Sequence, residues 1–176
     1  GGCAGTMVHL TRPMGRTPLP DEAVAITKAA GDIGISIALA VSLRDMNPLV
    51  YGNHSDFLAN VSPALKRQVE GIWLREPADW RRQLALVEEV DLAVRESLPL
   101  APVNVQLGPN GLQWCSRELL KGIAEASALS GRRVHMHFLE TLIQREWMDR
   151  EYPDGAVKFM KEIGLLSPRL TLAHCV

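Results

Sequence analysis

The sequence alternates between short apolar segments and longer amphipathic ones, and this alternation limits the possible folds more than any other feature of the chain. The short segments are rich in apolar or β-branched residues and are bounded by turn residues, which predicts strands. The longer segments carry apolar residues at helical spacing between capping or breaking residues, which predicts helices. We expect strands at 6–10, 33–43, 103–107, 134–139 and 169–176, and helices at 18–30, 63–74, 78–97, 116–131, 141–149 and 153–163.

Strands that alternate with helices in this way predict right-handed strand–helix–strand units around a parallel sheet, so the expected fold class is α/β. The run from Ile33 to Leu43 has no charged residue and indicates a strand buried on both faces, as in parallel sheets. A closed (β/α)8 barrel needs about 250 residues, so 176 residues correspond to part of one, with the helices outside. An open doubly wound sheet is the alternative, but no GxGxxG or Walker motif follows any expected strand.

The two ends of the sequence suggest a piece of something longer. The chain begins Gly1-Gly2-Cys3 rather than with Met, and it stops at Val176 while still in an apolar strand. We therefore expect residues 1–176 to form part of one barrel domain that is truncated at both ends.

Composition narrows the class of partner. The net charge is −1 and no basic block is present, so we expect no nucleic-acid partner and no anionic membrane surface. No apolar run approaches the roughly 20 residues of a membrane helix. The three cysteines are widely spaced and odd in number, which favours reduced thiols in the cytoplasm. The remaining partner class is a small molecule, with a homo-oligomer as a further possibility.

Three residues near the ends of the last two strands could carry chemistry. His137 lies near the end of one strand, Glu140 follows in the next loop, and His174 ends the final strand. Imidazoles bind zinc or ferrous iron, and such an ion yields hydroxide from water at neutral pH, while a nearby carboxylate can move the proton. His137 and His174 are therefore candidate metal ligands, and His174 and Glu140 are candidate catalytic residues. The plainer alternative is that both histidines are packed core residues.

Other candidates lie in loops that follow strands, where active sites of parallel α/β folds are found. Gln113 and Trp114 could bind a flat heterocycle, the indole by stacking and the amide by reading the ring edge. Asp45 and Asn47, with Tyr51 nearby, occupy a long polar loop at 44–60 and are further substrate-binding candidates, although Asp and Asn also form turns.

The remaining histidines are expected to have supporting or incidental places. His135 shares strand parity with His137 and should fill the layer below it. His9 and His54 are expected to be structural or surface residues.

The segments His135-Met136-His137-Phe138-Leu139-Glu140-Thr141 and Leu172-Ala173-His174-Cys175 resemble strands five and six of the amidohydrolase superfamily. The resemblance is to its group of cytosine deaminases, guanine deaminases, chlorohydrolases and methylthioadenosine/S-adenosylhomocysteine deaminases. Gly5-Thr6 is similar to the second-strand Gly-x-Thr-Thr segment, and 116–131 to the helix before strand five, so the chain would span about strands 2 to 6.

This resemblance implies a hydrolase with a divalent metal, zinc or iron, in a (β/α)8 barrel. By analogy, His137 is the strand-five ligand, Glu140 moves a proton to the leaving group, and His174 contacts the metal or its water. The family's strand-one His-x-His and strand-eight Asp are absent from this sequence. A deaminase of heterocyclic amines is the implied function, and the alternatives are a non-catalytic barrel remnant for binding or oligomerisation and a cyclic-amide hydrolase of the same superfamily.

Overall fold

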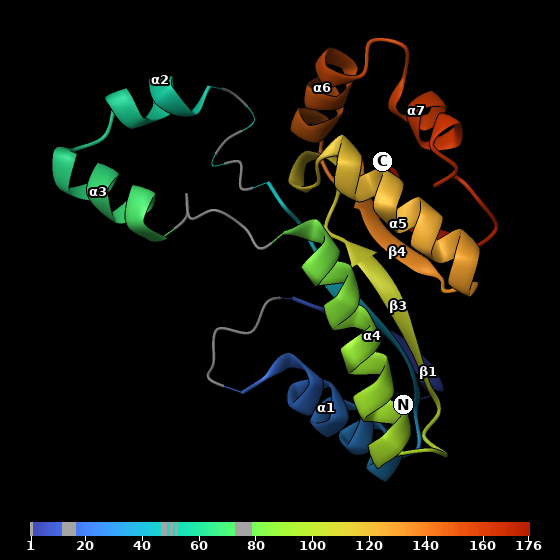
Figure 1. Ribbon diagram of the computed structural model, residues 1–176. Helices are drawn as coiled ribbons and strands as arrows, with labels where there is room; N and C mark the ends of the chain where they lie inside the picture. Colours follow the sequence, from blue (N-terminus) through green and yellow to red (C-terminus); the bar gives the residue numbers. More distant parts are fainter. Residues whose placement is uncertain (1, 12–16, 47–48, 50, 52, 73–78) are drawn as a thin grey trace.

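The protein contains one sheet of five parallel strands. The computed structural model describes residues 2–11, 17–46, 49, 51, 53–72 and 79–176. Neighbouring strands follow one another in chain order, so each new strand is added at the same edge (Figure 1). The expected α/β class and the partial barrel are therefore observed. The strands are β1 (Gly5–Leu10), β2 (Ser36–Leu43), β3 (Val103–Pro109), β4 (Val134–Phe138) and β5 (Leu170–His174).

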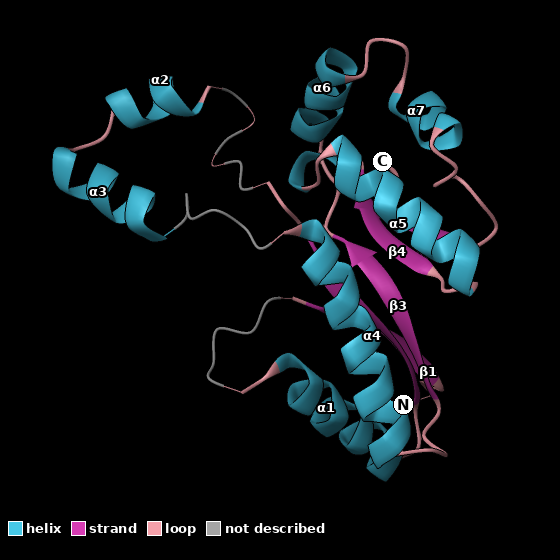
Figure 2. Cartoon of the chain, viewed as in Figure 1, coloured by secondary structure: helices cyan, strands magenta, loops and turns pink. Residues whose placement is uncertain are grey.

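Helices connect the strands, as right-handed crossover units require. Helices α1, α4 and α5 pack against one face of the sheet, while α2 and α3 lie apart from it (Figure 2). None of the described helices is long and apolar enough to cross a lipid bilayer. The helices are α1 (Leu19–Ile33), α2 (His54–Ala59), α3 (Pro63–Ile72), α4 (Trp80–Ser97), α5 (Arg117–Ser130), α6 (Leu142–Glu151) and α7 (Ala156–Glu162), and a 3-10 turn, η1, spans Leu112–Trp114.

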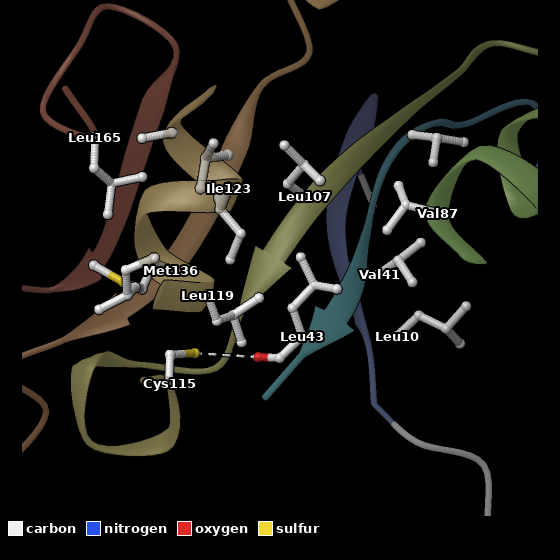
Figure 3. Packing of buried hydrophobic residues seen from close by; sticks show 14 of the residues in the cluster. Leu10, Val41, Leu43, Val87, Leu107, Cys115, Leu119, Ile123, Met136 and Leu165 are labelled. Atoms are coloured by element: carbon white, nitrogen blue, oxygen red, sulfur yellow. Dashed lines mark hydrogen bonds between the residues drawn. The ribbon is translucent and has the colours of Figure 1, made fainter. Parts of the chain in front are cut away.

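The hydrophobic core lies between the sheet and its helices, and β2 shows how the sequence builds it. Ile37, Leu39 and Leu43 alternate along the strand and are at most 4% exposed. They pack with residues of α4 and α5 such as Val87 and Leu119 (Figure 3). Full burial of an aliphatic side chain of this size contributes about 1.5–3 kcal/mol. The β2 residues that project from the opposite face of the sheet, Ala38, Ala40 and Ser42, are small, and this face is only partly covered.

Two of the differences from the expected boundaries have clear local causes. The sequence predicts that the first helix stops at Gly31, but α1 continues to Ile33 and ends at Gly34, whose φ of 75° is left-handed. Glycine adopts this conformation without strain, and Gly34 donates its N–H to the last carbonyls of the helix. The polar loop expected at 44–60 contains α2, because Asn53 caps it by accepting the N–H of Ser55 at 2.8 Å.

Cys115 is part of the core. Its thiol is 2% exposed and lies 3.4 Å from the carbonyl oxygen of Leu43 (Figure 3). Burial raises the pKa of Cys115 from its ordinary value to about 12, because the thiolate would lose its hydration. Cys3 and Cys175 are exposed, and none of the three forms a disulfide.

Gly108 allows β3 to approach β2 closely. A Cβ atom at this position would lie 2.6 Å from the carbonyl oxygen and 2.9 Å from the carbonyl carbon of Val41. Backbone atoms cannot move aside as a flexible side chain can. The residue that pairs with Gly108 is Ser42, so the close contact occurs near the carboxyl ends of both strands.

We expect Gly108→Ala to destabilise the protein by about 1–3 kcal/mol, because the added methyl group overpacks the two strands. Gly31→Ala is the matched control, since its Cβ meets nothing within 4 Å and it lies inside α1. The control should gain roughly 0.5–1 kcal/mol from the lower entropy of its unfolded state. Urea unfolding midpoints measure both, and an unchanged midpoint for Gly108→Ala would contradict the close approach.

Thiol reactivity tests the placement of Cys115. At pH 8 the raised pKa leaves almost no thiolate at this position, and burial excludes the reagent, so iodoacetamide should modify two cysteines quickly and the third only in denaturant. Cys3→Ala should lower the number of quickly modified cysteines to one and leave one cysteine that reacts only in denaturant. Rapid labelling of all three thiols in the native protein would contradict the burial of Cys115 in the core.

Candidate active site

Polar side chains gather where the strands end. Because all five strands run in the same direction, their carboxyl ends lie along one edge of the sheet. A cavity of about 260 Å³ lies there. The residues that line it are His9, Thr11, Arg44, Asn110, Gln113, Trp114, His137 and Glu140.

His137 and His174 face each other across β4 and β5. Nδ1 of His137 lies 3.1 Å from Nε2 of His174, and the two rings are stacked with centroids 5.3 Å apart. Strand register alone would not produce this contact, because His174 pairs with Phe138, whose side chain belongs to the core. His174 has a φ of 76° and Cys175 a φ of 59°. This left-handed backbone departs from the regular strand at the point where the His174 ring reaches His137.

The pair of imidazoles is compatible with part of a metal site. Two nitrogens that each lie about 2.0–2.1 Å from one tetrahedral zinc ion are roughly 3.3 Å apart, close to the separation observed here. Within the described part of the chain, however, no group of three or more His, Cys, Asp or Glu side chains is arranged to hold an ion. The described residues thus offer two imidazole donors and not a full ligand set.

Glu140 follows β4 at a sharp change of direction. The preceding residue, Leu139, has a φ of 53°, which is uncommon for a residue other than glycine. The Glu140 backbone N–H donates to Oε1 of Gln144 at 2.6 Å, which holds the loop. Thr141 then caps α6 by accepting the N–H of Gln144. The Glu140 side chain is left exposed on the cavity wall that His137 shares.

His9 also lines the cavity, whereas the sequence analysis expects it to be a structural or surface residue. Its Nε2 lies 3.1 Å from Oδ1 of Asn110, which also accepts the hydroxyl of Ser42 at 2.6 Å. Since Oδ1 can only accept, Nε2 of His9 carries the proton, and Nδ1 is free to accept from Nδ1 of His135 at 3.4 Å. The signal available in the sequence was the position of His9 next to the last residue of β1.

The pKa values of His9 and His135 are both lowered, which favours neutral rings. Burial is the main cause for each. For His9, the hydrogen bond to Asn110 opposes the shift and the nearby His137 adds to it. For His135, the three neighbouring imidazoles add to it. His135 is 7% exposed and lies beside His137, as expected for a residue of the supporting layer.

Gln113 and Trp114 lie in the 3-10 turn η1 after β3, on the cavity wall. Gln113 is buried, and its Oε1 accepts from Nε2 of Gln144 at 2.8 Å. Its Nε2 donates to the hydroxyl of Tyr51 at 3.4 Å. The guanidinium carbon of Arg44 lies 5.4 Å from the centroid of the Trp114 ring. Sequence reasoning named both η1 residues but missed Arg44, which is the first residue after β2.

Asp45 makes structural contacts and is not among the residues that line the cavity. Its two carboxylate oxygens accept the backbone N–H and the hydroxyl of Ser116. Ser116 in turn caps α5 by accepting the N–H of Leu119. Asn47 lies outside the described residues. Tyr51 is held beside the site by Arg150, which donates to its carbonyl oxygen at 2.8 Å, and burial raises the pKa of the Tyr51 phenol.

The surroundings of His54 match its expected structural place. It begins α2, and its Nε2 accepts the N–H of Leu49 at 3.1 Å. It is not among the residues that line the cavity.

Comparisons with known proteins agree with this architecture. No model of a known protein family matches the chain. Over 100 residues it is 31% identical to a 5′-deoxyadenosine deaminase of Methanothermobacter thermautotrophicus, an alignment that covers 56% of this chain and 23% of the relative. The resemblance to the amidohydrolase superfamily is confirmed. The chain thus spans less than a quarter of the length of this relative.

Solved structures share the fold. A guanine deaminase from C. acetobutylicum with bound guanine has a TM-score of 0.65 at 15% identity, covering 98% of this chain and 34% of that one. The atrazine chlorohydrolase TrzN from Arthrobacter aurescens TC1, solved with zinc, has a TM-score of 0.61 at 23% identity and covers 98% and 33%. The five strands and their helices therefore share the fold of about a third of each of these structures.

Asp45→Ala separates a capping role from a substrate-binding role. Loss of the two hydrogen bonds to Ser116 should destabilise the protein by about 2 kcal/mol, while the KM of the full-length protein for its substrate changes less than about two-fold. Asp149→Ala is the control, because this exposed residue only pairs with Arg145 one helical turn away. It should change stability by less than about 0.5 kcal/mol. Unchanged stability with a many-fold higher KM for Asp45→Ala would favour substrate binding instead.

Proposed function

We propose that this chain forms part of the active site of a metal-dependent hydrolase that breaks carbon–nitrogen bonds other than peptide bonds. The proposed reaction is the deamination of a heterocyclic amine. The observation that carries this proposal is the pair of facing nitrogens of His137 and His174, next to the cavity that Glu140 lines. The likeness to a 5′-deoxyadenosine deaminase supports the reaction class.

We propose that Nδ1 of His137 and Nε2 of His174 hold a divalent ion, zinc or iron. When bound, such an ion supplies activated water at neutral pH, because it lowers the pKa of water to about 7. Two imidazoles do not complete a four-coordinate site, so the proposal includes further ligands of the kind that the family resemblance implies. Zinc is favoured by its presence in the solved chlorohydrolase of the same fold.

Glu140 is the proposed proton carrier. Its carboxylate lines the cavity and is exposed, so it can reach both an attacking water molecule and the ring that water attacks. It would take a proton from water as the new carbon–oxygen bond forms. It would then give that proton to the leaving nitrogen as the carbon–nitrogen bond breaks, releasing ammonia. In this scheme His174 contacts the ion or its water and orients the attack.

Trp114 and Gln113 are the proposed substrate-binding residues. The indole can stack on a flat heterocycle, and the amide can bond to the ring edge. Arg44, which lies over the same indole, joins them on the cavity wall. Asp45 is left out of this set because Ser116 occupies both of its carboxylate oxygens. Asn47 stays a prediction from the sequence.

The wider setting is also proposed. A small heterocyclic molecule is the partner, with no nucleic acid, and a homo-oligomer is compatible with the chain. The free cysteines favour the cytoplasm. A non-catalytic barrel remnant and a cyclic-amide hydrolase remain the alternatives. About one tightly bound transition ion per full-length protein would count against the non-catalytic remnant. A panel of heterocyclic amines and cyclic amides would distinguish a deaminase from a cyclic-amide hydrolase.

Glu140→Gln tests the central role. In the full-length protein, with 5′-deoxyadenosine and guanine as trial substrates, kcat should fall about 100-fold or more, because an amide cannot carry the proton. The metal content should stay the same, because Glu140 is not a proposed ligand. Ammonia release measures turnover, and elemental analysis measures the metal.

Glu146→Gln is the matched control. Glu146 is an exposed glutamate in α6 and, like Glu140, follows β4 in the sequence. This variant should keep full activity. His137→Ala should lower both metal content and activity. Undiminished turnover in Glu140→Gln would rule out the proposed proton carrier, whereas loss of metal in that variant would make Glu140 a ligand instead.

A further inference from the structure

Two buried glutamines are linked in series between the loop after β4 and the cavity. Gln144, in the first turn of α6, is 1% exposed, and Gln113, in η1, is 4% exposed. Their side-chain amides bond directly, Nε2 of Gln144 donating to Oε1 of Gln113 at 2.8 Å. A primary amide has one accepting end and one donating end, so the orientation of one glutamine determines the orientation of the other.

The backbone N–H of Glu140 fixes the first amide. This group can only donate, and it bonds to Oε1 of Gln144 at 2.6 Å. The NH₂ group of Gln144 must therefore point the other way, toward Gln113. It meets an acceptor there, so Oε1 of Gln113 faces Gln144 and the NH₂ group of Gln113 is turned away from it. That NH₂ group donates to the Tyr51 hydroxyl at 3.4 Å.

The surroundings leave little room for the amides to move. A Cβ atom at Gly111 would lie 2.7 Å from Oε1 of Gln113, so the amide packs directly over this glycine. The backbone N–H of Gln144 is held by the hydroxyl of Thr141 at 3.2 Å. Gln113 also lines the cavity together with Glu140 and Trp114.

We propose that Gln144 is a positioning residue that fixes Gln113 as a hydrogen-bond donor toward the cavity. The site would then select heterocycles that present an acceptor, a ring nitrogen or a carbonyl oxygen, on the edge that meets Gln113 while the ring stacks on Trp114. A ring with a C–H or N–H at that edge could not accept from the second N–H of this NH₂ group, the one that does not bond to Tyr51, and would bind more weakly. The substrate class in this inference rests on the proposed function, whereas the orientation of the amides does not.

Gln144→Glu tests the inference because it should reverse the orientation of the Gln113 amide. Both oxygens of a carboxylate accept, so residue 144 would still accept the Glu140 N–H but could no longer donate to Gln113. Gln113 should turn its NH₂ group toward the new carboxylate and present its carbonyl oxygen to the cavity. Its preference for an acceptor on the ligand should then be lost.

The probes are 5′-deoxyadenosine and its 1-deaza, 3-deaza and 7-deaza analogues, each of which replaces one ring nitrogen by C–H. Dissociation constants are measured by quenching of Trp fluorescence in full-length protein that carries Glu140→Gln, which prevents turnover and keeps the backbone N–H. We expect one analogue to bind about 10-fold more weakly than the parent nucleoside, as loss of one hydrogen bond predicts. Adding Gln144→Glu should reduce that difference to less than about two-fold.

Gln83→Glu is the matched control. Gln83 is another buried glutamine, 8% exposed, and its Oε1 accepts the backbone N–H of Arg44 at 3.0 Å. The same change of chemistry there adds a buried carboxylate without reversing Gln113, so the 10-fold difference should persist. If Gln144→Glu does not fold, Gln113→Glu serves instead, because its carboxylate still accepts from Gln144 but offers no donor. A 10-fold difference that survives in Gln144→Glu, or in Gln113→Glu where Gln144→Glu does not fold, would overturn the proposal.

Failure of the proposed function would be recognised separately. If none of the nucleosides binds, the proposed substrate class is wrong, and the amide orientation is then judged by NMR of protein labelled with ¹⁵N at glutamine side chains. Slow solvent exchange of the Gln144 and Gln113 side-chain amide protons in the unaltered protein supports the positioning role. Exchange of the Gln113 protons should be faster in Gln144→Leu. Rapid exchange of both amides in the unaltered protein overturns it.

Discussion

The parallel pairing of five strands in chain order is the constraint on which the rest of this structure depends. It gives all the strands one direction, so residues that are far apart in the sequence, such as His9, Asn110 and His174, meet at one edge of the sheet. It also requires a helix between most strands, because a parallel crossover cannot be made by a short turn. Those helices supply the core on one face and leave the other face to small and polar residues. Residues that project from one face of the sheet therefore stabilise the core, and those that project from the other face are available for chemistry.

Two departures from regular strand geometry bring the proposed reacting groups together. Leu139 and His174 both have left-handed backbones at the ends of neighbouring strands, where residues other than glycine rarely adopt them. The first turns the chain so that the Glu140 backbone meets Gln144, and the second occurs where the ring of His174 reaches His137. Such conformations cost of order 1–3 kcal/mol each and persist when the surrounding structure holds them in place. Their occurrence on both sides of the imidazole pair supports a functional interpretation of this edge.

The sequence predicted the strands, their alternation with helices and the cavity residues that directly follow strand ends, because these depend on periodicity and on chain direction. Gln113, Trp114, His137 and Glu140 were found in this way. What could not be predicted depends on contacts between distant segments. Asp45 looked like a binding residue because it stands in a polar loop, but its oxygens meet Ser116, which is distant in the sequence. The position of His9 near the end of its strand was a weak signal, since its partners Asn110 and His135 come from distant parts of the chain.

The polar face of the sheet is better explained by chemistry than by folding. A barrel interior filled with aliphatic residues would fold at least as well, whereas buried imidazoles and amides stabilise little and must each find a partner. Here most of them do, through the bonds of His9 to Asn110 and of Gln113 to Gln144. Oε1 of Gln106 is an exception among the described residues, buried without a hydrogen-bond partner beneath this layer. Their bonds hold these groups in fixed orientation, and neutral imidazoles and polarised amides are groups whose orientation decides what they can bind.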